Sequence, residues 1–115
     1  YDDGTQTRCF TYINDFVNGI IRASTRPEGE NEAFNLGSTR ETQIRDLADF
    51  VLEAADCTER EKEFVDTDKL YDDTYEDLNR RIPEVSKAKR RLDWEAETSL
   101  KEGLERTVKW GRANY

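Results

Sequence analysis

The sequence contains no histidine, and its 115 residues include only two cysteines. Without histidine, the chain lacks the commonest metal ligand and the side chain that most often moves protons near neutral pH. Cys9 and Cys57 do not form a C-x-x-C pair, the usual cysteine pattern of a zinc site. We therefore expect no metal site and two reduced thiols, with Cys9 as a small buried hydrophobe.

Long apolar runs and a secretory leader are also missing. No apolar stretch approaches the roughly 20 residues that a membrane-spanning helix needs, and no basic segment followed by an apolar one opens the chain. We expect a cytoplasmic protein without membrane contact, folded as one domain at this length. The chain has no methionine and begins with Tyr1, which suggests a piece cut from a longer polypeptide.

Basic charge is in short supply, since 26 acidic residues face 18 basic ones and the net charge is −8. Most of this excess lies in residues 56–77. Net acidity disfavours nucleic acid, whose binding depends on neutralising phosphates with lysine and arginine. An acidic surface with more arginine than lysine fits a halophilic source as well as an ordinary acidic domain, and equal folding in low and molar salt would exclude the first.

Regularly spaced apolar residues show that the chain folds despite its polarity. A short strand is predicted around residues 9–12, followed by a helix with Asn14 as its N-cap and an end near Ser24, before Pro27. The apolar stripe of this helix has the i, i+3, i+4, i+7, i+8 spacing: Ile13, Phe16, Val17, Ile20 and Ile21.

A second strand and helix are predicted to follow. Polar and apolar residues alternate over residues 32–37, and the run ends in glycine, which is typical of a strand. Thr42 is the predicted N-cap of a helix that stops near Ala55. Strand, helix, strand and helix in succession favour a right-handed crossover.

The last part of the chain predicts a brief strand at residues 63–65, a long loop at 66–79 and a short basic helix at 86–92. Ser99 and Glu102 form a capping box for a final helix that ends near Arg112. Trp94 is expected in the groove between these two helices. Together the elements predict a small α+β domain with about four helices and two or three short strands.

Three segments resemble one enzyme family: "DGTQTRCFTYINDFVNGI", "AFNLGSTRETQIRDLADFV" and "RRIPEVSKAKRRLDWEAETSLKEGLERTVKW". In order and separation they are similar to the carboxyl-terminal, substrate-binding part of the extended short-chain dehydrogenases/reductases that act on nucleotide sugars. That family includes UDP-galactose 4-epimerase, dTDP-glucose 4,6-dehydratase and UDP-glucuronate decarboxylase. The resemblance leaves only residues 56–76 unmatched.

The resemblance implies that two arginines bind the diphosphate of a UDP- or dTDP-sugar. They are Arg8 of the Q-T-R motif and Arg81 of the R-R-x-P motif, with Arg80 as neighbour and substitute. A guanidinium offers paired donors that match phosphate oxygens. Phe10 and Tyr12 are expected as core and pocket wall. Without the resemblance, both arginines would be read as surface residues paired with acids.

Two other charged groups have plainer explanations. A basic cluster lacks the interleaved aromatics of a nucleic-acid patch and is predicted to be a solvated helix face: Arg80, Arg81, Lys87, Lys89, Arg90 and Arg91. Four clustered acids match no calcium-loop spacing and are predicted to belong to an acidic lid: Asp72, Asp73, Glu76 and Asp77.

The chain departs from the family at Asp93, where glycine is usual, so Asp93 is expected to adopt a left-handed backbone conformation. The family's chemistry needs bound NAD, a glycine-rich turn, and a tyrosine followed four residues later by lysine. The sequence contains neither motif.

We therefore predict that the chain has no catalytic residue and binds no cofactor of its own. An absent N-terminal Rossmann domain is expected to carry NAD in a parent enzyme, which the resemblance implies is a homodimer. The alternative is a non-enzymatic acidic domain that binds a partner protein.

Overall fold

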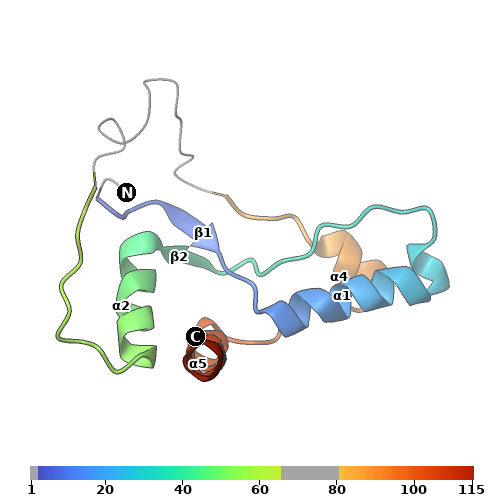
Figure 1. Ribbon diagram of the computed structural model, residues 1–115. Helices are drawn as coiled ribbons and strands as arrows, with labels where there is room; N and C mark the ends of the chain where they lie inside the picture. The colour runs from blue at the N-terminus through green and yellow to red at the C-terminus, as the bar shows by residue number, and fades with distance from the viewer. Residues whose placement is uncertain (1–2, 66–80) are drawn as a thin grey trace.

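The computed structural model describes residues 3–65 and 81–115. Its elements in chain order are β1 (Thr7–Cys9), α1 (Ile13–Thr25), the 3-10 helix η1 (Pro27–Gly29), β2 (Glu41–Gln43), α2 (Ile44–Ala54), α4 (Ser86–Leu92) and α5 (Leu100–Asn114). Figure 1 shows α2 beside the two strands, while α1 and α4 extend away on the other side. The predicted small α+β fold is confirmed.

The two strands form a short antiparallel pair in which Arg8 lies opposite Thr42. The pairing continues toward the N-terminus through two backbone hydrogen bonds, from Ile44 N to Gln6 O and from Arg45 N to Gly4 O, both of 2.9 Å. The strands predicted at residues 9–12 and 32–37 are therefore wrong in position. An antiparallel pair also contradicts the predicted right-handed crossover, which applies to parallel strands.

The alternation of polar and apolar residues over residues 32–37 has a cause other than strand pairing. Phe34 and Leu36 pack against the core from this segment, while its polar groups bond to side chains and backbone elsewhere. Lys87 Nζ donates to Ala33 O at 2.9 Å, and Asn35 Nδ2 donates to Glu84 O at 3.3 Å. The segment is thus an extended link that is tied down on its flanks, and a burial period of two does not by itself make a strand.

Both predicted side-chain caps of the first two helices are wrong. Helix α1 begins at Ile13 after Tyr12, and helix α2 begins at Ile44 after Gln43; neither preceding residue makes a side-chain cap hydrogen bond. Thr42 is instead part of β2. The chain enters both helices directly from extended backbone, so tertiary connections, rather than caps, determine where these helices begin.

The two C-terminal helices follow their local signals. Helix α4 has the predicted bounds, and helix α5 begins directly after Ser99, whose Oγ accepts a hydrogen bond from Glu102 N at 3.2 Å. The predicted N-cap is confirmed. Residues 63–65 form no strand, contrary to expectation, and the loop predicted at 66–79 lies outside the described residues.

Helix α4 ends at Leu92, and the residue after it, Asp93, has the predicted left-handed conformation with φ 50° and ψ 38°. Two arginines from the end of α1 stabilise this terminus: Arg22 Nη1 donates to Leu92 O and Asp93 O, and Arg26 Nη1 donates to Leu92 O at 2.9 Å. The last carbonyls of a helix have no partner within it, and cations are favoured there. These contacts join α1 to α4.

The core is small and centres on Trp94, which is 1% exposed and packs with Ala88 and Leu92. The indole Nε1 donates to Asp15 O at 2.9 Å. A Cβ added at Gly19 of α1 would lie 3.1 Å from Trp94 Cε2, so this glycine permits the close approach. Trp94 thus lies between α1 and α4, and not in the groove predicted between α4 and α5.

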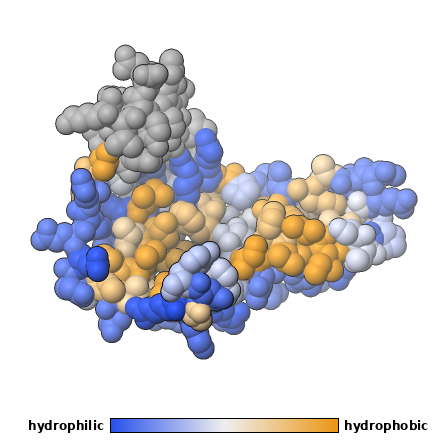
Figure 2. Space-filling view, in the orientation of Figure 1, coloured by the Kyte–Doolittle hydropathy of each residue, from blue (hydrophilic) through white to orange (hydrophobic). Residues whose placement is uncertain are grey.

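A broad apolar face remains exposed on α1. Its stripe residues are 40 to 59% exposed: Ile13, Phe16, Val17, Ile20 and Ile21. Figure 2 shows apolar residues gathered along this helix. In the part of the chain that the structure covers, no helix has both the length and the apolar character to cross a bilayer.

Candidate functional site

One surface pocket brings together the two arginines singled out by the sequence. It has a volume of about 580 Å³ and is lined by Arg8 and Cys9 of β1 and by Arg81, Ile82 and Pro83 from the segment leading into α4. The pocket is shallow and open to solvent, so a molecule bound there would keep much of its surface exposed. Figure 1 shows this orange segment approaching the strand pair from α4.

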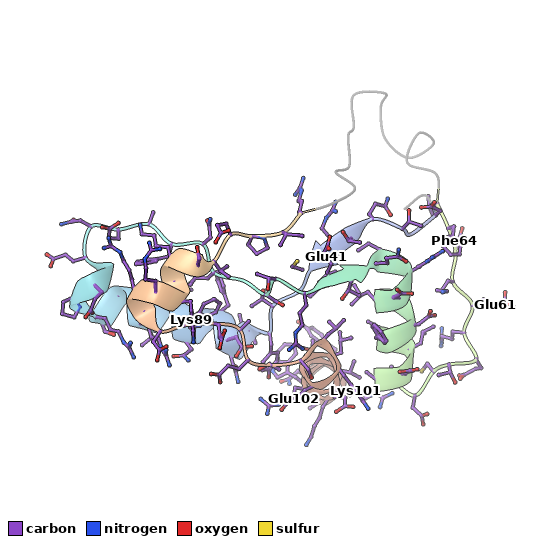
Figure 3. The ribbon with its side chains drawn as sticks, turned by 180° about the vertical axis from the view of Figure 1, so that it is seen from behind. Glu41, Glu61, Phe64, Lys89, Lys101 and Glu102 are labelled. Atoms are coloured by element: carbon purple, nitrogen blue, oxygen red, sulfur yellow. The ribbon has the colours of Figure 1, made fainter. Side chains whose placement is uncertain are left out.

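Arg8 is held close to its strand. Its Nη1 donates to Thr7 O at 2.7 Å, and the side chain is half-buried. Thr7 Oγ1 in turn donates to Glu41 Oε1 at 3.0 Å, and Figure 3 shows Glu41 on the neighbouring strand. The Arg8 side chain is therefore held against its own strand, and that strand is bonded to β2 through Thr7 and Glu41.

Arg81 is exposed and lies in a segment without regular structure. Pro83 follows two residues later, and a proline favours extended backbone in the residue before it. Glu84 anchors the far end, because its carbonyl accepts from Asn35 and its Oε1 accepts from Ser86 N at 2.9 Å. Arg80 lies outside the described residues, so its predicted role as a substitute stays a prediction.

Phe10 and Tyr12 line a pocket, but a different one from the arginines. Their pocket, of about 310 Å³, lies between the start of α1 and helix α5. The Tyr12 side chain lies close to Gly103, and Arg106 lies over its ring with Cζ at 5.6 Å from the ring centroid. The two aromatics thus face α5, while Arg8 of the same segment lines the other pocket together with Arg81. Their roles in binding stay predictions.

Sequence reasoning missed Cys9, Ile82 and Pro83 as residues of the arginine pocket. Their closeness to Arg8 and Arg81 in the sequence is the signal that would have suggested them. Neither Cys9 nor Cys57 is part of a disulfide, and both side chains are half-buried, so the prediction of a fully buried Cys9 is wrong. Within residues 3–65 and 81–115, no group of three or more cysteines and carboxylates is placed to hold a metal ion.

An ion-pair cluster ties α4 to the extended link. Glu32 accepts from Lys87 Nζ at 2.7 Å and from Arg91 Nη1 at 3.2 Å. The hydrogen bond from Lys87, and then the charges of Lys87 and Arg91, lower the pKa of Glu32 below its ordinary value of 4.5. Lys87 also lies 5.0 Å from the centroid of the Phe34 ring. The two ion pairs of Glu32 therefore contribute stability only while Glu32 is ionised.

We expect the stability difference between the wild type and Glu32→Gln to depend on pH. A carboxyl group whose pKa is lower in the folded state than in the unfolded state stabilises the fold. This stabilisation is complete at pH values above the unfolded-state pKa and is lost as the pH falls through the folded-state pKa. The wild type should therefore be more stable than the variant at pH values above 4.5, and the difference should close as the pH falls through the lowered pKa of Glu32 in the folded state. Urea unfolding at a series of pH values measures this.

Glu105→Gln is the matched control, because it removes an exposed carboxylate from α5 far along the chain from the cluster. Its stability difference should change little with pH. A difference for Glu32→Gln that stays constant from pH 3 to 7 would contradict the assignment, because the loss would then come from something other than the ionised carboxylate.

Comparison with known proteins identifies the family. The profile of the GDP-mannose 4,6 dehydratase family matches residues 1–107. The chain belongs to this family. The resemblance to extended short-chain dehydrogenases/reductases that act on nucleotide sugars is thereby confirmed.

Individual relatives agree with this assignment. The chain is 38% identical over 94% of its length to UDP-glucuronic acid decarboxylase 1 of Arabidopsis thaliana, covering 23% of that protein. It is 37% identical over 99% of its length to UDP-glucuronate 4-epimerase of Thermodesulfobacterium geofontis, covering 33% of that protein. The chain thus spans about a quarter to a third of the length of these relatives.

A solved structure shows the same fold. The UDP-glucuronic acid 4-epimerase of Bacillus cereus, in complex with UDP-glucuronic acid and NAD, superposes with a TM-score of 0.81 at 25% identity. The match covers 100% of this chain and 35% of the epimerase chain. The arrangement of short strands and helices in this chain is therefore the one found in about a third of that epimerase.

Proposed function

We propose that this chain binds the diphosphate of a nucleotide sugar within an NAD-dependent epimerase, dehydratase or decarboxylase. The observation that carries the proposal is the shared pocket of Arg8 and Arg81, which come from distant parts of the sequence. Two guanidinium groups thus line one pocket on a chain of net charge −8. Such paired donors suit the oxygens of a diphosphate.

The known relatives support the class of ligand. The epimerase of Bacillus cereus was solved with UDP-glucuronic acid, and two relatives are named for reactions on UDP-glucuronic acid. The proposed ligand of this chain is accordingly a UDP- or dTDP-sugar. The pocket of Arg8 and Arg81 would receive the diphosphate.

We propose that a Rossmann domain outside these 115 residues supplies NAD and the catalytic tyrosine. The sequence contains neither the glycine-rich turn nor a tyrosine with lysine four residues on. The exposed apolar face of α1 is what a neighbouring domain would cover, since monomeric proteins rarely leave broad apolar patches in water. The residues seen here would then form the substrate side of the enzyme.

A titration with UDP tests the proposal. Two charge-assisted contacts of about 2 kcal/mol each correspond to a Kd of roughly 1 mM. In NMR spectra, UDP at millimolar concentration should shift the backbone amides of Arg8, Cys9, Arg81 and Ile82, while uridine should not. Binding should weaken as salt rises, because the contacts are ionic.

Two results would contradict the proposal. One is equal shifts with UDP and uridine, which would remove the diphosphate from the recognition. The other is the absence of any shift at the two arginine segments. A peptide partner that shifts residues of the acidic stretch, with no response to UDP, would favour the interaction-domain alternative.

A further inference from the structure

A third segment of the chain lies between the two segments that carry Arg8 and Arg81. Residues 35–38 lie between the link that joins β1 to α1 and the segment that leads into α4. Figure 1 shows this teal trace running between the blue and orange ones. The separation of Arg8 and Arg81 is therefore tied to what occupies this space.

Gly37 of the third segment lies between Thr11 and Pro83. It is buried, and a Cβ added there would lie 3.2 Å from Pro83 Cγ and 3.5 Å from Thr11 Oγ1. Pro83 is two residues from Arg81, and Thr11 is three residues from Arg8. Glycine thus lets the two segments approach more closely than any side chain would allow.

Hydrogen bonds hold both segments to residues 35–38. Ser38 N donates to Thr11 Oγ1 at 2.9 Å on one side. Asn35 Nδ2 donates to Glu84 O at 3.3 Å on the other side. Leu36, between these two donors, packs against the Trp94 core. The segment therefore packs against the Trp94 core and is hydrogen-bonded to Thr11 on one side and to Glu84 on the other.

From these contacts we infer that residues 35–38 act as a spacer that sets the distance between Arg8 and Arg81, so that the pocket selects a diphosphate over a monophosphate. The inference rests on the proposed function. A diphosphate presents two charged groups, and both guanidiniums reach it only at the correct separation. A monophosphate needs one guanidinium and is indifferent to the spacing. Gly37 and Thr11 are positioning residues in this scheme, because they act through the arginines.

The test compares the affinities for UDP and UMP in Gly37→Ala. The added methyl group must displace the Pro83 segment by a few tenths of an ångström, because 3.2 Å is tighter than ordinary contact. The variant should bind UDP about five-fold more weakly, since a binding site tolerates little misplacement, and should bind UMP as the wild type does. NMR titration gives both affinities, and thermal unfolding shows that the variant is folded.

Gly111→Ala is the matched control, because a Cβ added at Gly111 has no atom within 4 Å. Its affinities for UDP and UMP should both equal those of the wild type. Thr11→Val provides a second variant should Gly37→Ala fail to fold. It removes the acceptor of Ser38 N with little change in volume and should also lower the preference for UDP, while Thr11→Ser should restore it.

The outcomes separate this inference from the proposed function. If Arg8→Ala and Arg81→Ala leave UDP binding unchanged, the proposed diphosphate site is wrong, and the proposed role of residues 35–38 is wrong as well. If those two variants lose UDP binding while Gly37→Ala and Thr11→Val keep the wild-type ratio of UDP to UMP affinity, only the spacer is overturned. An equal loss of both affinities would also overturn it, because that result indicates general damage.

Discussion

Arg81→Ala is expected to weaken UDP binding by at least about ten-fold. A hydrogen bond to a charged group contributes roughly 1.5–3 kcal/mol, and 1.4 kcal/mol corresponds to a factor of ten in affinity. Arg81 is exposed and outside regular structure, so its removal should leave the stability of the fold unchanged. Arg8→Ala should lose a similar amount of affinity, and NMR titration with UDP measures both.

Lysine variants separate charge from geometry at the same positions. Arg81→Lys keeps the positive charge but loses the planar pair of donors, so it should recover only part of the affinity. Arg90→Ala is the matched control, since it removes an exposed arginine of α4 that does not line the pocket. A loss of UDP affinity in Arg90→Ala equal to that in Arg81→Ala would show that only the total charge matters, and would contradict a defined site.

Trp94→Ala is expected to have the largest effect on stability. Replacing a buried aromatic residue by alanine costs about 3–5 kcal/mol, and the whole stability of a domain is only about 5–15 kcal/mol. The loss should be near the upper end, because the core is small and the indole also donates to Asp15 O. Urea unfolding followed by far-ultraviolet circular dichroism measures it, because that signal does not depend on either tryptophan.

Two variants define the origin of that loss. Trp94→Phe keeps most of the apolar area but removes the indole donor, so it should cost less than Trp94→Ala. Trp110→Ala is the control on α5: Trp110 is 57% exposed, and its loss should cost less than about 1 kcal/mol. Comparable destabilisation by Trp94→Ala and Trp110→Ala would contradict a core centred on Trp94.

Short sequence patterns were sufficient to predict two helix ends, the start of α5 and the end of α4. Ser99 and Glu102 predicted the start of α5, and the left-handed residue Asp93 was expected at the end of α4. At the start of α5 the deciding contact, from Glu102 N to Ser99 Oγ, spans three residues, whereas the left-handed Asp93 was expected from the family resemblance, in which glycine is usual at that position. The same reasoning failed at Asn14 and Thr42, because the chain reaches α1 and α2 from extended segments held by distant partners.

The strands show the limit of periodicity. Residues 32–37 alternate because Phe34 and Leu36 pack on the core, and their hydrogen bonds run to side chains and to Glu84. The actual partner of β1 is the three-residue strand β2, which carries no apolar alternation of its own. Pairing between segments that are far apart in the sequence depends on backbone geometry that no local pattern records.

The sequence by itself determined the enzyme family, the α+β class and the two candidate arginines, because motifs and helix signals reside in short stretches of chain. Only the tertiary structure decided that Arg8 and Arg81 share a pocket, that Phe10 and Tyr12 line another, and that Gly37 lies between the arginine segments. Those facts depend on distances between residues separated by dozens of positions, which arise only when the chain packs around Trp94.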